Sequence, residues 1–256
     1  YLYSPRFEVR SEALLALESI PELDHETIVA LIREVKANVY TTAYVAARIL
    51  GKQRSRIAIP ALIESLDGPD YMLQSMAMIA LARLQAFEAV GKIEQLMRSM
   101  ENPRVRISGA YALELFGRID SIPTLISCLK AEDRPASVSD ELVLSISGIL
   151  GIDKEFYLLY SEFIDDNSYG IAQLIAYSKD LNLGDDRLNV WISAVDALFA
   201  PDSDTAPLAR LLLASPRITN SILMLSDGLL DPGLTYPGFN FLCAYIALHI
   251  EDLKDY

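Results

Sequence analysis

The chain has few of the residues that metal and thiol chemistry require. It contains 2 His and 2 Cys among 256 residues, and Cys128 and Cys243 form no CxxC pair. A disulfide framework and a cysteine-ligated zinc site are therefore excluded. Two isolated cysteines are typical of a reducing compartment, so we expect a cytoplasmic protein.

Long hydrophobic runs and catalytic motifs are also absent. No stretch of about eighteen uncharged apolar residues occurs, so we expect no direct membrane insertion. The sequence is still compatible with a parent protein that is associated with a membrane. The G-x-S-x-G, Walker and G-x-G-x-x-G motifs are missing. Asp202–Asp204 opens like a calcium loop, but Pro207 and Leu213 stand where such a loop needs Gly and Glu. The sequence therefore predicts no catalytic residue, no metal ligand and no cofactor, and we expect a protein that is not an enzyme.

The net charge of −13 comes entirely from the second half of the chain. Residues 1–130 contain 15 Lys and Arg against 15 Asp and Glu, whereas residues 131–256 contain 7 against 20. An acidic surface repels phosphate backbones and anionic lipids. We therefore expect no nucleic-acid partner, and the charge favours a protein partner that presents a basic segment.

The first half nevertheless contains one local basic run, at Arg48, Lys52, Arg54 and Arg56. Cations near the end of a helix are typical of a solvated helix terminus, where they face the negative pole of the helix dipole. A phosphate site is the alternative interpretation of the same run.

Two apolar patterns repeat along the first 151 residues. The first pattern contains Leu31, Leu62, Ile93 and Leu125 at intervals of 31, 31 and 32 residues. The second pattern follows each copy of the first, and an earlier copy of it begins at Phe7. When aligned, the second series places these residues in one column: Ala16, Ala46, Ala80, Ala112 and Ile146.

Both patterns have apolar residues three and four apart, which is the spacing of one helix face. Pro60 and Pro123 fall where the first turn of a helix is expected. Gly51, Gly117 and Gly151 fall where a helix closes on a left-handed residue. Each unit of about 32 residues is thus a helix–turn–helix that cannot cover its apolar face alone, so consecutive units must stack. The predicted fold is all-α, an α-solenoid of stacked helix pairs.

The turn before one of these helices resembles a known repeat. Asn102-Pro103-Arg104-Val105-Arg106, followed by Ala110 and Ala112 and closed by Gly117, is similar to the short HEAT-like repeat of the phycobilin-lyase type. The resemblance covers roughly residues 5–151 and implies an α-solenoid scaffold. Tetratricopeptide and ankyrin signatures are absent.

The resemblance leaves enzymatic alternatives open. A bilin-lyase-like enzyme, or a chaperone that acts on a cofactor-bearing protein, uses the same repeat. His25-Glu26 is similar to one His-Glu pair of deoxyhypusine hydroxylase, but that di-iron family needs four pairs, and a histidine at a helix start is the simpler interpretation. A DNA-glycosylase-like solenoid is disfavoured by the acidic charge.

The domain organisation follows from where the repeats stop. We expect regular HEAT-like repeats over 1–151, with a truncated first repeat, and degenerate acidic capping helices over 152–256. These helices continue the same solenoid in our interpretation, and a separate helical domain is the alternative. Because Tyr1 opens within a repeat and similar repeats are attached to larger bacterial proteins, we expect a domain excised from a longer bacterial protein.

One column of the repeat is a candidate partner-binding surface. Five equivalent positions near the start of successive second helices are polar or aromatic: Arg10, Tyr40, Gln74, Arg106 and Asp140. Arg and Tyr are frequent interface anchors. The alternative is that Arg10 and Arg106 only tie adjacent turns together. We therefore expect a non-enzymatic protein-interaction, scaffold or regulatory domain.

Overall fold

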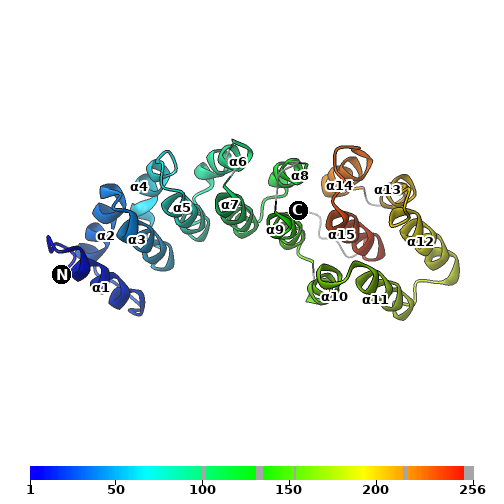
Figure 1. Ribbon diagram of the computed structural model, residues 1–256, viewed down its shortest axis with the longest axis horizontal. Coiled ribbons are helices and arrows are strands. Elements are labelled where there is room, and N and C mark those ends of the chain that lie inside the picture. The colour runs from blue at the N-terminus through cyan, green and yellow to red at the C-terminus, as the bar shows by residue number, and fades with distance from the viewer. Residues whose placement is uncertain (100–101, 131–134, 153, 216–217, 251–256) are drawn as a thin grey trace. The chain divides into compact units, whose positions relative to one another are not determined.

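The computed structural model describes all residues except 100–101, 131–134, 153, 216–217 and 251–256, and the side chain of Tyr40. The described residues form fifteen α-helices and three short 3-10 helices, and they contain no strand (Figure 1). The all-α solenoid class expected from the repeats is confirmed. The chain divides into two compact units, Tyr1–Phe116 and Gly117–Tyr256.

The first unit is a stack of helix pairs. Its helices are α1 (Phe7–Glu18), α2 (His25–Ala37), α3 (Tyr40–Lys52), α4 (Ile59–Ser65), α5 (Tyr71–Arg83), α6 (Val90–Ser99) and α7 (Pro103–Phe116). Each even-numbered helix packs on the odd-numbered helix that follows it, and α5 packs between α3 and α7. Figure 1 shows the two resulting rows of helices.

The repeated apolar columns form the core of the helix pairs. Leu31, Leu62, Ile93 and Leu125 are completely buried. Four of the five residues in the second column are also buried, and Ala16 alone is exposed because α1 is the first helix of its row. The predicted first-turn prolines stand at the starts of α4 and α8.

The closing residues of the helices differ from the sequence prediction at one place. Gly117 and Gly151 have φ of 66° and 67°, as expected of left-handed helix caps. The prediction for Gly51 is wrong, because Gly51 lies inside α3 and the left-handed residue after that helix is Arg54, with φ 50°. Gly51 is instead needed for close packing, since a Cβ there would lie 2.7 Å from the Cα of Ala80 in α5.

The second unit is arranged around its last helix. Its helices are α8 (Ile122–Leu129), α9 (Ala136–Ile149), α10 (Lys154–Asp165), α11 (Asn167–Asp180), α12 (Asp185–Leu198), α13 (Ala206–Leu213), α14 (Asn220–Leu230) and α15 (Pro237–Leu248). Every residue of α15 from Gly238 to Leu248 is buried. This helix contacts each helix from α9 to α14, which enclose it in Figure 1.

Aromatic side chains fill the space around α15. Phe163 of α10 packs against Phe241 of α15 with the rings tilted by 30° and their centroids 4.4 Å apart, and Phe156 contacts Tyr245 edge to face at 5.2 Å. Trp191 of α12 is 2% exposed and donates its indole N–H to the carbonyl of Ala244 at 2.9 Å. These contacts attach α10 and α12 to the same central helix.

Two helices end the described part of the chain. α14 begins at a cap in which the Thr219 hydroxyl accepts a hydrogen bond from the N–H of Ile222. α15 begins at Pro237 and ends at Leu248.

Candidate interaction surfaces

Arg10, the first member of the predicted column, is engaged in contacts within its own repeat. Its guanidinium donates to the carbonyl of Ser4 at 2.9 Å and forms an ion pair with Glu34 of α2 at 3.3 Å. The side chain is largely buried between these partners. Arg10 therefore ties the segment before α1 to α2, as the alternative interpretation of this column expects.

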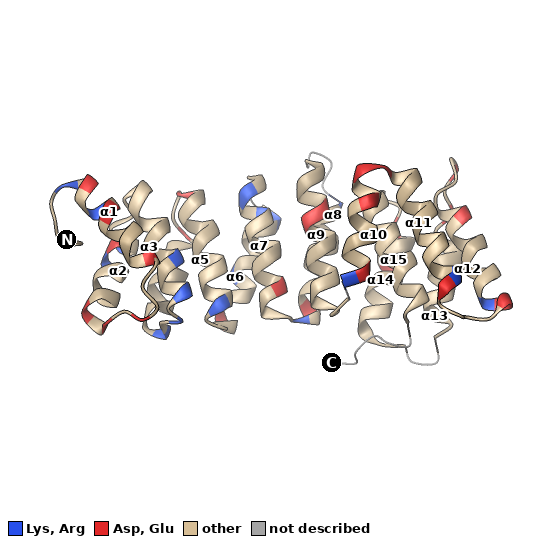
Figure 2. Cartoon of the chain, turned by 90° about the horizontal axis from the view of Figure 1, so that it is seen from below, with Lys and Arg blue, Asp and Glu red and all other residues tan. Residues whose placement is uncertain are grey.

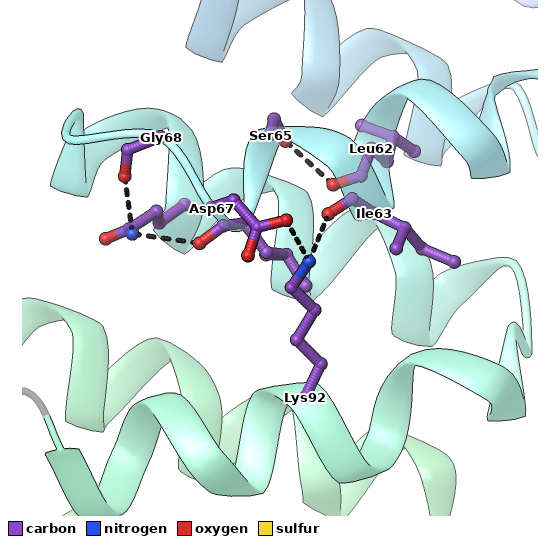
Figure 3. A network of polar contacts seen from close by, with 8 residues as sticks. Leu62, Ile63, Ser65, Asp67, Gly68 and Lys92 are labelled. Atoms are coloured by element: carbon purple, nitrogen blue, oxygen red, sulfur yellow. Dashed lines mark hydrogen bonds and ion pairs between the residues drawn. The ribbon is translucent and has the colours of Figure 1, made fainter.

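Gln74 is buried at the start of α5 and serves the turn that precedes it. Its side-chain amide donates to the carbonyls of Leu66 and Gly68, at 3.1 Å and 2.8 Å. In Figure 3, Lys92 of α6 reaches the same turn from the other side and contacts the carbonyl of Ile63 and the carboxylate of Asp67. Both side chains satisfy polar groups at the C-terminal end of α4, where helical carbonyls have no partner in the helix.

The remaining members of the column have different surroundings. Asp140 of α9 accepts hydrogen bonds from the hydroxyls of Tyr160, at 2.9 Å, and of Tyr236. Burial and the Asp140 carboxylate raise the pKa of Tyr160, so this hydroxyl stays a donor. Arg106 is half-buried in the first turn of α7, and the side chain of Tyr40 lies outside the described residues. The partner-binding role of the five positions stays a prediction.

An acidic and apolar surface lies on the exposed side of α10, within the acidic half of the chain. We call it the α10 face, and it consists of Glu155, Tyr157, Leu158, Glu162, Ile164 and Asp165. Leu158 is 54% exposed and Ile164 is 45% exposed. The spacing from Leu158 to Glu162 and Asp165 places these three side chains on one side of the helix. Red segments on α10 and at its junction with α11 mark the carboxylates in Figure 2.

The few histidines and cysteines do not gather into a metal or thiol site within the described residues. No group of three or more His, Cys, Asp or Glu side chains that could hold a metal ion occurs there. His25 is exposed at the first position of α2, next to the Asp24 cap. Cys128 is buried on the apolar side of α8, as a small hydrophobic residue would be.

Two family models match the chain. The model of HEAT repeats matches residues 59–147, and the model of the PBS lyase HEAT-like repeat matches residues 42–68. The chain carries HEAT-like repeats. A search of curated proteins found no match to it.

The HEAT-like matches confirm the family resemblance of the sequence and suggest a repeat scaffold or protein-interaction role. They extend from α3 to α9, so the α10 face lies beyond the part of the chain that the two models match. A HEAT-like fold does not by itself specify a function, so the function depends on the residues that the surfaces present. Within the described part of the chain, no helix combines the length and hydrophobicity that a bilayer crossing needs.

Arg106 gives a direct test of the predicted column in the HEAT-like repeats. We expect Arg106→Ala to weaken binding of a protein partner by about 1 kcal/mol or more, because truncating an arginine anchor removes charge-assisted hydrogen bonds. The thermal midpoint is expected to stay near that of the unchanged chain. Binding is measured by titration calorimetry and stability by circular dichroism. A lower midpoint with intact binding would mean that Arg106 only ties turns together.

Proposed function

We propose that the chain is a protein-interaction domain of a larger protein or complex, and that its α10 face binds a basic amphipathic segment of the partner. The observation that carries this proposal is the alternation of exposed apolar and carboxylate side chains on α10. Leu158 and Ile164 supply apolar contacts, and Glu162 and Asp165 supply the charge that selects a basic partner. A helix with Lys or Arg beside its apolar stripe fits such a surface.

The charge of the second unit supports this choice of partner. Residues 117–256 contain 21 Asp and Glu against 9 Lys and Arg, so their net charge is −12. Residues 1–116 contain 14 against 13, a net charge of −1. The field that attracts a basic segment therefore originates in the second unit. Such a field mainly raises the association rate, and it weakens when salt is added.

The test uses a fluorescent amphipathic peptide of Lys and Leu, titrated with the full chain and followed by anisotropy. Leu158→Ala is expected to weaken binding about tenfold, because a half-exposed apolar anchor becomes buried in the complex. Leu230→Ala on α14 is the matched control, since Leu230 is 51% exposed. Glu162→Gln is expected to slow association with a smaller effect on dissociation.

Two outcomes would contradict the α10 face as the binding site. One is an equal loss of affinity in Leu158→Ala and Leu230→Ala. The other is an affinity unchanged between about 0.05 M and 0.5 M salt, because exposed charges are strongly screened at the higher concentration. Retention of a tetrapyrrole by the chain would favour the bilin-lyase-like alternative, with which the PBS lyase HEAT-like match is compatible.

A further inference from the structure

A basic pocket lies at the C-terminal ends of α3, α5 and α7, within the first unit. Its volume is about 560 Å³, and its lining consists of Gly51, Lys52, Arg54, Ala82, Arg83, Gln85 and Leu115. Three of these residues are cationic and none is acidic. In Figure 2, blue segments gather at the lower ends of α3 and α5. Lys52 and Arg54, which belong to the basic run of the sequence, thus line the same pocket as Arg83 from the next repeat.

Some polar side chains at this end of the helices are already used by the fold. Lys52 donates to the carbonyl of Glu18 at 2.7 Å, and Gln85 donates to the carbonyl of Leu115 at 3.0 Å. Just beyond the pocket, Arg56 donates to the carbonyl of Leu84 at 3.0 Å. These contacts satisfy the carbonyls that helix C-termini leave unpaired, and they account for three of the polar residues.

Arg54 and Arg83 differ from Lys52, Gln85 and Arg56 because their guanidinium groups are not used by the fold. Both side chains are exposed and line the pocket, and neither forms a hydrogen bond or an ion pair through its guanidinium with another described residue. Two guanidinium groups on one concave wall repel each other unless an anion lies between them. Each can hold a carboxylate or phosphoryl group through two parallel hydrogen bonds.

The backbone beneath the pocket supports a role for its side chains. Arg54 and Gln85 occupy the left-handed closing positions of α3 and α5, with φ of 50° and 51°. α7 and α9 place Gly117 and Gly151 at the corresponding positions, where glycine is favoured. Among the closings of α3, α5, α7 and α9, the two without glycine are therefore the two whose side chains line this pocket.

We propose that this pocket binds carboxylate groups of an acidic polypeptide segment, with Arg54 and Arg83 as its anchors. Ala82 and Leu115 give the lining an apolar part, which suits a peptide side chain next to the carboxylate. A nucleic acid needs a basic stripe that follows its backbone, whereas residues 1–116 are nearly neutral, with 13 Lys and Arg against 14 Asp and Glu. The proposal is independent of the α10 face, whose expected partner has the opposite charge.

The test measures binding of a fluorescent peptide of Glu, Asp and Leu to the full chain by anisotropy at low salt. Arg54→Asn and Arg83→Gln are each expected to weaken binding at least tenfold, and the double variant is expected to abolish it. Asn suits position 54 because the chain already accepts Asn38 and Asn182 at φ of 48° and 54°.

Arg104→Gln is the matched control. It removes one exposed positive charge at the opposite end of α7 from Leu115, and it is expected to leave the affinity unchanged. Thermal midpoints of all variants separate lost binding from lost folding. Equal weakening by Arg104→Gln would overturn the pocket as the site and indicate a general charge effect.

Competition identifies the source of the anionic group. A peptide in which Gln and Asn replace Glu and Asp is expected not to bind. Inorganic phosphate is expected to displace the acidic peptide only at millimolar concentration or above. A phosphopeptide or a single-stranded oligonucleotide that binds more tightly than the acidic peptide would overturn carboxylate recognition in favour of a phosphoryl ligand.

Discussion

Trp191→Ala is expected to lower the free energy of unfolding of the second unit by about 4 kcal/mol. Trp191 is 2% exposed and belongs to α12, while its indole donates to Ala244 of α15. The substitution removes the largest buried side chain of the unit and leaves a cavity beside the central helix. It also removes the hydrogen bond that links two helices whose bonded residues are 53 positions apart.

Trp191→Phe separates the two contributions. The phenyl ring retains much of the apolar contact but has no N–H. Trp191→Phe is therefore expected to lower the free energy of unfolding by less than Trp191→Ala does, by about 2 kcal/mol. Differential scanning calorimetry of the full chain measures both variants, because the protein contains 1 Trp and the substitutions remove its fluorescence. Unchanged unfolding of Trp191→Ala would show that α12 contributes little to the stability of this unit.

Gly170→Ala is expected to destabilise the same unit by about 2 kcal/mol through overpacking. A Cβ at position 170 of α11 would lie 2.3 Å from the Cα and 2.6 Å from the backbone N of Phe163 in α10. Backbone atoms cannot rotate away as a flexible side chain can, so the two helices must separate. This separation costs more than the roughly 1 kcal/mol that Ala contributes over Gly in a helix.

Gly91→Ala in α6 is the matched control. Nothing lies within 4 Å of a Cβ built at Gly91, so this substitution is expected to raise stability by about 0.5–1 kcal/mol. Chemical denaturation, monitored by circular dichroism, gives the free energy of unfolding of both variants. Stabilisation by Gly170→Ala would disprove the close approach of α10 and α11.

The repeat region was predictable because each helix carries its own local signals. Apolar spacing located α1 to α9, and first-turn prolines marked the starts of α4 and α8. The misassigned Gly51 shows the limit of such signals. A glycine near a helix end suits either a left-handed cap or a close helix contact, and only the position of Ala80, in the next repeat, distinguishes the two.

The surfaces were harder to predict than the helices. Alignment of the repeats correctly placed Gln74 near a helix start, but its burial depends on the carbonyls of Leu66 and Gly68, which the turn brings within reach. The basic pocket combines Arg54 with Arg83, which lie in different repeats and become neighbours only when α3 packs on α5. A periodic pattern cannot show how side chains at helix ends converge.

The position of α15 in the chain has a consequence for the order of folding. In the first unit, side-chain hydrogen bonds between repeats join residues 25 to 34 positions apart, such as Lys92 to Asp67 and Lys52 to Glu18. Each pair can therefore dock as soon as its neighbour has formed.

In the second unit, the hydroxyl of Tyr236 donates to Asp140, which lies 96 positions earlier in the chain. The helices from α9 to α14 thus leave the ribosome before the helix that fills their centre has been synthesised. High contact order slows folding and prolongs exposure of apolar surface, so the apolar sides of α9 to α14 stay uncovered until α15 has been synthesised.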